Sequence, residues 1–411
     1  MSITGSAKKA PRTGPLAGLR VLEMTQIMSG PTCGLLLADM GADVIKIEKL
    51  PGGDDARGYR DPQINGVSAP FLMLNRNKRG LAIDLKKPQG RALMLRMVQD
   101  ADVLVENFRG GTMEKLGLGY ETLREVNPAL IYCAISGYGR TGPYADKGGF
   151  DLIAQGFAGL MAVTGEPGRP PAKSGNAVSD MNAGILAATG ILAAYIHKLK
   201  TGEGQIVDTS LSDAALQQTY WHAAVWLATQ REPQPTGSAH ILTAPYQAFE
   251  ASDGWINIGG ANQTNWERIC TVLGHPEWRE DPRFVTNSDR MAHLDELVTL
   301  MNAVLRQRTR AEWQADMDAA GVPAGPVHTI GEALSHPQTL ARGMVVTLEH
   351  PQAGTTRGIG CPIHFSQTPT NTGQAAPLLG QHTRELLQEH GLSETEIDDL
   401  IEQGAVSQAA A

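Results

Sequence analysis

The sequence predicts an α/β protein with a large domain built on a parallel sheet and a second, smaller α+β domain. Between residues 19 and 229, short apolar runs typical of strands alternate with helical segments. The composition changes near residue 230, where the proline-containing stretch 231–237 has the character of a linker. Beyond it, residues 252–254 separate two apolar segments, which indicates a hairpin. A chain of 411 residues is long enough for both domains.

The first three elements form a β-α-β unit. Residues 19–24 and 44–48 are predicted strands, and Gly30 with Pro31 opens a helix over 32–40, because proline is tolerated in a first helical turn. A nicotinamide dinucleotide site would need the G-x-G-x-x-G pattern between strand and helix. Glu48 would suit its acidic residue, but the loop 26–31 lacks the glycines. The sequence therefore argues against such a site.

Three polar loops follow predicted strands or turns further along. A basic turn covers 75–80, before the strand 81–85 and the helix 88–99, and the loop 107–111 follows the strand 102–106. The glycine-rich loop 136–144, with Arg140, follows the strand 130–135. Ligands bind at the carboxyl ends of parallel strands, and such a loop suits phosphate. Basic clusters are also ordinary surface charge, and glycine loops are often plain turns.

The central stretch 178–184 leads from a glycine- and proline-rich run, 165–171, into a helix over 185–199. That helix is apolar on nearly all sides, which predicts burial. Asp180 stands where the loop enters the helix. It could cap the helix through its carboxylate, or it could serve as a nucleophile. Position alone does not decide between the two.

The remaining chain is predicted as follows. A strand covers 205–210 and a helix 211–229; the small domain holds strands at 245–251 and 255–258 and helices at 264–273, 289–306 and 310–320. Residues 328–365 are mixed and irregular, and 384–390 form an amphipathic helix. The domains are set at 15–228 and 241–330, with linkers at 229–240 and 331–375 and flexible tails at 1–14 and 405–411.

The net charge and the positions of the cysteines narrow the functional classes to which the protein can belong. A net charge of −8 argues against nucleic-acid binding, which depends on clustered positive charge. The four cysteines are far apart, so we expect buried free thiols in a reducing, cytoplasmic setting, with no metal site. The longest apolar run, 185–196, is too short to span a membrane.

Taken together, these loops resemble the class III CoA-transferases, the family of formyl-CoA and carnitine CoA-transferases. The matching stretches are 15–23, 41–48, 75–79, 105–109, 136–139, 179–180, 201–208, 245–249 and 379–383. None is specific alone, but the ordered set spans nearly the whole chain. The resemblance implies a Rossmann-like open domain over 15–228 closed by 376–400, the smaller α+β domain, and two subunits interlocked as a homodimer.

The resemblance also implies the chemistry. Asp180 aligns with the family's catalytic aspartate, which attacks an acyl-CoA thioester and then carries CoA as an aspartyl thioester. A cap and a nucleophile need not exclude each other. Acyl-CoA and a free carboxylic acid would be the substrates, with no tightly bound cofactor and no metal.

Individual site residues are carried over in the same way. The implied CoA contacts are Lys49, Asn75, Lys78, Arg79, Asn107, Arg109, Lys115 and Tyr138. The candidates for the substrate or for oxyanion stabilisation are Met28, Ser29, Gly237, Ser238, His240, Gly259 and Gly260. Glycine-rich segments can supply backbone N–H donors to an oxyanion.

Three functions stay open. Met28 stands where formyl-CoA transferases carry glutamine, and the loop 237–240 is shorter, so oxalate specificity is doubtful. The pattern is closer to members that use succinyl-CoA with dicarboxylic or hydroxy acids. The family's racemase branch has a histidine where this chain has Phe150, and it is one alternative. A non-catalytic CoA-binding protein is the other, although Asp180 is present.

Overall fold

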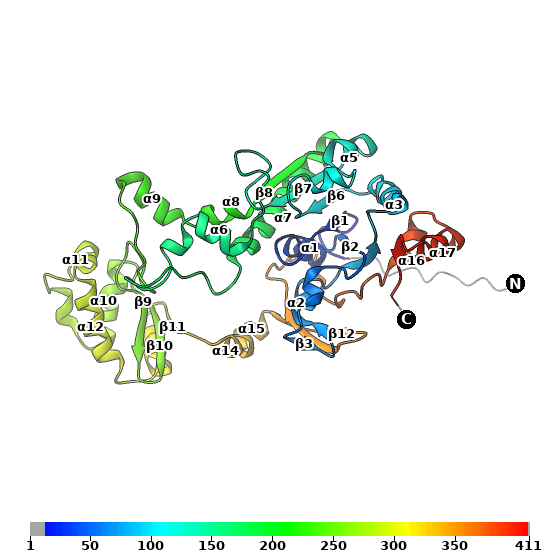
Figure 1. Ribbon diagram of the computed structural model, residues 1–411. Helices are drawn as coiled ribbons and strands as arrows, with labels where there is room; N and C mark the ends of the chain where they lie inside the picture. Colours follow the sequence, from blue (N-terminus) through cyan, green and yellow to red (C-terminus); the bar gives the residue numbers. More distant parts are fainter. Residues whose placement is uncertain (1–12, 410–411) are drawn as a thin grey trace. The chain divides into compact units, whose positions relative to one another are not determined.

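The computed structural model describes residues 13–409, so the parts 1–12 and 410–411 of the predicted tails 1–14 and 405–411 lie outside it. The chain divides into two compact units (Figure 1). The large unit comprises the described residues up to Ala158 together with Gly175–Gln218 and the C-terminal part from Pro337. The small unit comprises Gly159–Ser174 and Thr219–His336. It thus takes in a segment, Gly159–Ser174, that the sequence analysis placed in the large domain.

The large unit is built on a seven-stranded sheet in the order β14-β5-β2-β1-β6-β7-β8. Its strands are β1 (Arg20–Met24), β2 (Asp43–Lys49), β5 (Arg79–Ile83), β6 (Val103–Glu106), β7 (Ile131–Ser136), β8 (Ile206–Ser210) and β14 (Val406–Ser407). All pairs are parallel except that of β14 with β5. This confirms the predicted parallel sheet. The chain builds outward from β1 in both directions, so the order reverses between β1 and β6, where ligands bind in open α/β sheets.

The side chains of the central strands are buried on both faces of the sheet, and this burial stabilises the strands. Val21 of β1 pairs with Val44 of β2 and Val103 of β6, and all three side chains are buried. Branched aliphatic side chains pack well on such a pleated surface. Helices α3 (Pro88–Val98) and α5 (Tyr120–Val126) contribute to the core under the sheet. A near-continuous apolar strand run is what a doubly covered parallel sheet requires.

Helix α7 (Val178–Thr201) packs against α1 (Ser29–Asp39) through small side chains. A Cβ atom at Gly184 would lie 2.5 Å from the backbone oxygen of Ser29, so only glycine allows this approach. The prediction that this helix is buried all round is wrong for the single chain. Ile196 and Leu199 lie on its surface, because no element of the large unit covers that side.

Several other predictions need correction. The predicted C-terminal tail is ordered to residue 409: Ala405 is buried and β14 pairs with β5. The predicted helix 211–229 is two helices, α8 (Leu211–Gln217) and α9 (Tyr220–Thr229). The predicted return linker contains the hairpin of β12 (Val345–His350) and β13 (Gly354–Ile359), which contacts α2 (Ala69–Leu74).

The small unit has the predicted α+β architecture. Strands β9 (Tyr246–Ala251) and β10 (Gly254–Gly259) form the predicted hairpin, and β11 (Ala324–Pro326) adds a third strand. The helices are α10 (Gln263–Val272), α11 (Asn287–Ala292), α12 (Leu294–Leu305) and α13 (Arg310–Ala319), followed by α14 (Ile330–Ser335). Phe249, Ile256, Trp266 and Met301 are buried in one core between sheet and helices.

Candidate active site

Asp180 lies in the first turn of α7, two residues after the first helical residue, Val178. The N-cap is Ala177, so the interpretation of Asp180 as the cap is wrong. Asp151 takes that role from another helix, α6 (Asp151–Phe157). Its Oδ1 accepts the backbone N–H of Ser179 at 2.9 Å and that of Asp180 at 3.4 Å. Gln155 Nε2 donates to its other oxygen at 2.7 Å.

The surroundings of Asp180 disfavour its charged form. Burial, together with the negative charge of Asp151, raises the pKa of Asp180 to about 6. The carboxylate is therefore ionised at neutral pH but incompletely solvated. Such a poorly stabilised carboxylate is a better nucleophile than one in water, and perturbed acids of this kind cluster at catalytic sites.

A cavity of about 360 Å³ opens in front of Asp180. It lies where β1, β6 and β7 end, which is the predicted edge of the sheet. Its lining consists of Gln26, Ile27, Met28, Ser29, Asp55, Tyr59, Asn107, Phe108, Arg109, Ile135, Ser136, Gly137, Lys147, Gly148, Gly149, Phe150, Asp180 and Leu211. Two carboxylates, Asp55 and Asp180, two cations and several amide or hydroxyl groups thus face one space.

A second cavity of about 250 Å³ adjoins the first, because Gln26 and Phe108 line both. Met24, Ile47, Ile83, Leu85 and Leu116 give it an apolar lining. Its charged lining consists of Lys49, Lys86, Glu48, Asp54 and Asp84. The two cavities together offer a polar chamber that contains Asp180 and a mainly apolar chamber that carries both lysines and carboxylates.

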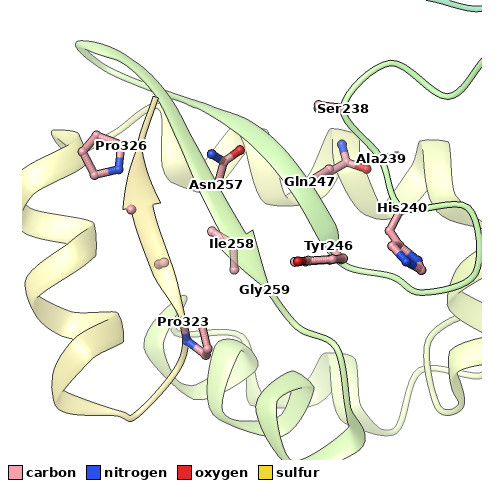
Figure 2. A pocket seen from close by; sticks show the side chains of 12 residues that line it. Ser238, Ala239, His240, Tyr246, Gln247, Asn257, Ile258, Gly259, Pro323 and Pro326 are labelled. Carbon is pink, nitrogen blue, oxygen red and sulfur yellow. The ribbon is translucent and has the colours of Figure 1, made fainter. Parts of the chain in front are cut away.

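The small unit has a cavity of its own, of about 680 Å³, beside the sheet formed by β9, β10 and β11. Figure 2 shows Tyr246 between Ile258 and His240 in its lining. His240 Nδ1 accepts the backbone N–H of Leu242 at 3.1 Å, so in the neutral ring the proton is on Nε2. The ring packs against Tyr246 with 5.3 Å between centroids.

The predicted site residues divide into those that line these cavities and those that do not. Met28, Ser29, Asn107 and Arg109 line the chamber of Asp180, and Lys49 lines the adjoining one.

Two further predicted CoA contacts lie outside both chambers. Lys115 is exposed on α4 (Thr112–Lys115) and lines neither of them. Tyr138 packs edge-on against Tyr144 and Phe157 and lines a separate hollow.

Three predicted CoA contacts have structural roles instead. Lys78 is buried, and its Nζ lies 2.8 Å from Glu23 Oε2 and 3.0 Å from Asn75 Oδ1. Burial also lowers the pKa of Lys78 to about 8. Arg79 is buried too, bonded to Asp43 and to two glutamates of α16 (Thr383–Glu389). A phosphate cannot reach these groups, so their assignment as CoA contacts is not supported.

The glycines proposed as oxyanion donors are already bonded. The backbone N–H of Gly259 donates to Pro323 O at 2.8 Å, that of Gly260 to Pro245 O at 2.7 Å, and that of Gly237 to Gly165 O at 2.9 Å. These N–H groups cannot also hold an oxyanion, so that assignment is not supported either. Ser238 and His240 keep side chains in the lining of the small unit's cavity.

Sequence reasoning missed Asp151 and Lys147. Lys147 lines the chamber of Asp180, and its Nζ lies 3.4 Å from the centre of the Tyr144 ring. Asp151 reaches Asp180 across 29 residues of sequence. Local patterns do not reveal such a contact. The only available signal was an acid at the start of the helix after the glycine-rich loop.

Three further features concern the thiols, possible metal-binding groups and the length of apolar helices. The four cysteines are buried and free, as expected. Within residues 13–409, no cluster of three or more His, Cys, Asp and Glu side chains could hold a metal ion. The same part of the chain contains no helix with both the length and the apolar character needed to cross a bilayer.

Comparison with known proteins agrees with this geometry. The model of "CoA-transferase family III" matches residues 16–383. The succinate–glutarate CoA-transferase of Agrobacterium fabrum is 39% identical over 384 residues, covering 92% of this chain and 96% of that protein. The succinyl-CoA–D-citramalate CoA-transferase of Chloroflexus aurantiacus is 38% identical over 397 residues, covering 96% and 98%. The crystal structure of a CaiB/BaiF family protein from Brucella suis superposes with a TM-score of 0.83 at 38% identity, covering 92% and 100%. The chain is therefore an enzyme of CoA-transferase family III.

Proposed function

We propose that this enzyme transfers CoA from succinyl-CoA to a second dicarboxylic or hydroxy acid through a covalent intermediate on Asp180. The observation that carries the proposal is a half-buried carboxylate with a raised pKa facing a cavity at the carboxyl edge of the sheet. The names of the two relatives support succinyl-CoA or succinate as one substrate and a dicarboxylic or hydroxy acid as the other.

The reaction balances without an external acid, base or metal. An oxygen of Asp180 attacks the thioester carbonyl, the C–S bond breaks, and an acyl–aspartyl anhydride forms with release of CoA thiolate. The thiolate attacks the aspartyl carbonyl, which expels the first carboxylate and leaves an aspartyl-CoA thioester. The acceptor carboxylate repeats the two steps in reverse, and Asp180 is regenerated.

The two adjoining cavities suit an acyl-CoA. We assign the thioester to the chamber of Asp180 and the adenine ring to the apolar chamber. Arg109, Lys147 and Lys49 supply positive charge along this path for the phosphates. Ser29 begins α1, so its backbone N–H has no partner within the helix and is a candidate oxyanion donor.

We propose the cavity of the small unit as a candidate carboxylate-binding site in its own right. His240 Nε2–H points away from the hydrogen bond made by Nδ1, and the Ser238 hydroxyl lines the same space. Neutral donors bind a carboxylate without requiring a buried counter-charge.

We also propose a cytoplasmic homodimer. In the single chain Ile185, Ile196 and Leu199 leave an apolar face on α7, and Tyr220, Trp221 and Leu227 leave another on α9. Apolar faces of this kind mark protein–protein contacts. Light scattering at micromolar protein should report twice the chain mass, and a monomer would contradict the proposal.

Intact-mass analysis tests the covalent step. Succinyl-CoA alone should add one CoA, less one water, to each subunit, and hydroxylamine should remove it. The Asp180→Asn variant should stay unmodified under the same conditions. Transfer activity in wild type without an adduct and without exchange of labelled succinate into succinyl-CoA would overturn the covalent mechanism.

A further inference from the structure

The loop formed by Gln26, Ile27, Met28 and Ser29, here called the site loop, connects β1 to α1. All four residues line the chamber of Asp180. Ile27 has a φ of +66°, in the left-handed region of conformational space. A β-branched residue there is a genuine outlier, because its Cβ atom crowds the backbone in this conformation. It persists only where surrounding contacts hold it.

Two side chains from segments that follow other strands, β2 and β6, hold the site loop through hydrogen bonds. Asp54 Oδ1 accepts the backbone N–H of Ile27 at 3.0 Å and that of Ala56 at 2.9 Å. Asn107 accepts the N–H of Gln26 at 2.9 Å and donates to the backbone oxygen of the same residue at 2.9 Å. Because Asn107 follows β6, it ties the loop across the point where the strand order reverses.

Asp54 is itself anchored in the interior. It is 2% exposed, and its Oδ2 lies 2.9 Å from Lys46 Nζ. Lys46 also contacts Glu23 Oε1 at 3.1 Å and donates to Thr25 O at 3.1 Å. Burial alone would raise the pKa of Asp54, but the Lys46 ammonium and the two backbone N–H groups outweigh it and hold that pKa below its usual value. The acceptor for Ile27 therefore stays charged.

We propose that Asp54 is a positioning residue for transfer: its carboxylate, anchored by Lys46, holds Ile27 in the left-handed conformation and so sets Met28 and Ser29 against the chamber of Asp180. The proposal rests on the CoA-transfer function proposed above. Asp54 lines the adjoining apolar chamber but not the chamber of Asp180, so any effect it has on the chamber of Asp180 passes through the site loop. A charged acceptor is suited to this role, because its hydrogen bond to a backbone N–H is stronger than a neutral one.

The test compares the effect of Asp54→Ala on two backgrounds. With Ile27 present, loss of the acceptor should let the loop relax, and kcat should fall by up to ~10²-fold, the cost of a misplacement of about 1 Å. On the Ile27→Gly background the same change should cost about threefold or less, because glycine adopts a positive φ without strain. For Asp54→Ala with Ile27 present, the fold decrease in kcat should exceed any fold increase in KM for succinyl-CoA. Equal losses on both backgrounds would overturn the proposal.

A control separates positioning from loss of a buried charge. Arg76→Met breaks another buried ion pair of the large unit, Arg76 with Asp39, which does not touch the site loop. It should lower the melting temperature and leave kcat within about twofold, since surroundings far from the loop do not set its conformation. A fall in kcat as large as that of Asp54→Ala would contradict a specific role for Asp54.

If Asp54→Ala does not fold, Ile27→Pro provides the second test, because proline fixes φ near −65° and removes the N–H that Asp54 accepts. Full activity of that variant would overturn the proposal. The outcomes also separate the two proposals. A wild-type enzyme that forms no adduct and transfers no CoA would overturn the proposed function. An active wild-type enzyme in which Asp54→Ala has the same effect with and without Ile27→Gly would overturn only the positioning role of Asp54.

Discussion

Asp151 accepts a hydrogen bond from the backbone N–H of Asp180 and places a second carboxylate beside it at the start of α7. One side chain thus does two things. It satisfies N–H groups that a helix leaves without partners, and its charge opposes ionisation of its neighbour. The same residue therefore caps the helix end and, after burial, contributes to the raised pKa of Asp180.

The first prediction concerns the pH dependence of transfer. Asp180 must be ionised to attack, and its pKa is about 6, so kcat/KM for succinyl-CoA should rise with pH through about 6 and level off above 7. Asp151→Asn removes the neighbouring charge but keeps an oxygen that can accept both backbone N–H groups. We expect its profile to shift to lower pH. A shift to higher pH, or a profile unchanged by the substitution, would contradict the coupling of the two acids.

The second prediction concerns stability. The folded pKa of Asp180 lies above the unfolded value, so the folded state binds more protons between about pH 4 and pH 6. The carboxylate therefore lowers the free energy of unfolding as pH rises through that window. Asp180→Asn should abolish transfer, by several orders of magnitude. It should also raise the melting temperature at pH 8, with little effect at pH 4.

Calorimetry at the two pH values tests that sign, and Asp146→Asn, a substitution of a surface acid of the same unit, is a matched control. A lower melting temperature for Asp180→Asn at pH 8 would show that the carboxylate stabilises the fold.

The third prediction concerns selection of the acid. If His240 Nε2–H binds a carboxylate of the free acid, as proposed, His240→Ala removes a hydrogen bond to a charged group, which is worth about 1.5–3 kcal/mol. The value of kcat/KM for glutarate should then fall about tenfold or more, while that for the monocarboxylic acid of equal length should change little. Equal losses for both acids would place the role of His240 elsewhere.

Patterning predicted the sheet, the central helix and the hairpin, because each depends on the period of apolar residues along a short stretch. It failed where long-range contacts decide. Lys78 and Arg79 have the composition of a surface basic turn, yet Glu23, Asp43 and α16 enclose them, and those partners lie 36 or more residues away for Arg79. Asp180 was located correctly at a helix start, but its cap comes from Asp151, and no local pattern records that. The pairing of β14 with β5 was missed for the same reason, because Val406 lies opposite Ile83, a residue far away in the sequence.

The last prediction separates transfer from proton exchange at the carbon next to the thioester. Racemisation there needs two groups that exchange protons on opposite faces of that carbon. The family resemblance aligns Phe150 with the racemase histidine; Phe150 lines the chamber of Asp180 and is 72% exposed. Its ring cannot accept a proton at any pH, whereas an imidazole can near neutrality. The described residues that line this chamber include no histidine.

A 2-methylacyl-CoA incubated with the enzyme in heavy water should therefore keep its α-proton, as measured by mass spectrometry, while succinyl-CoA in the same buffer forms the adduct. Rapid deuterium uptake in wild type would contradict the assignment and make Asp180 an acid–base group. Uptake that appeared only in Phe150→His would instead support it, because the second base would then have been supplied by the substitution.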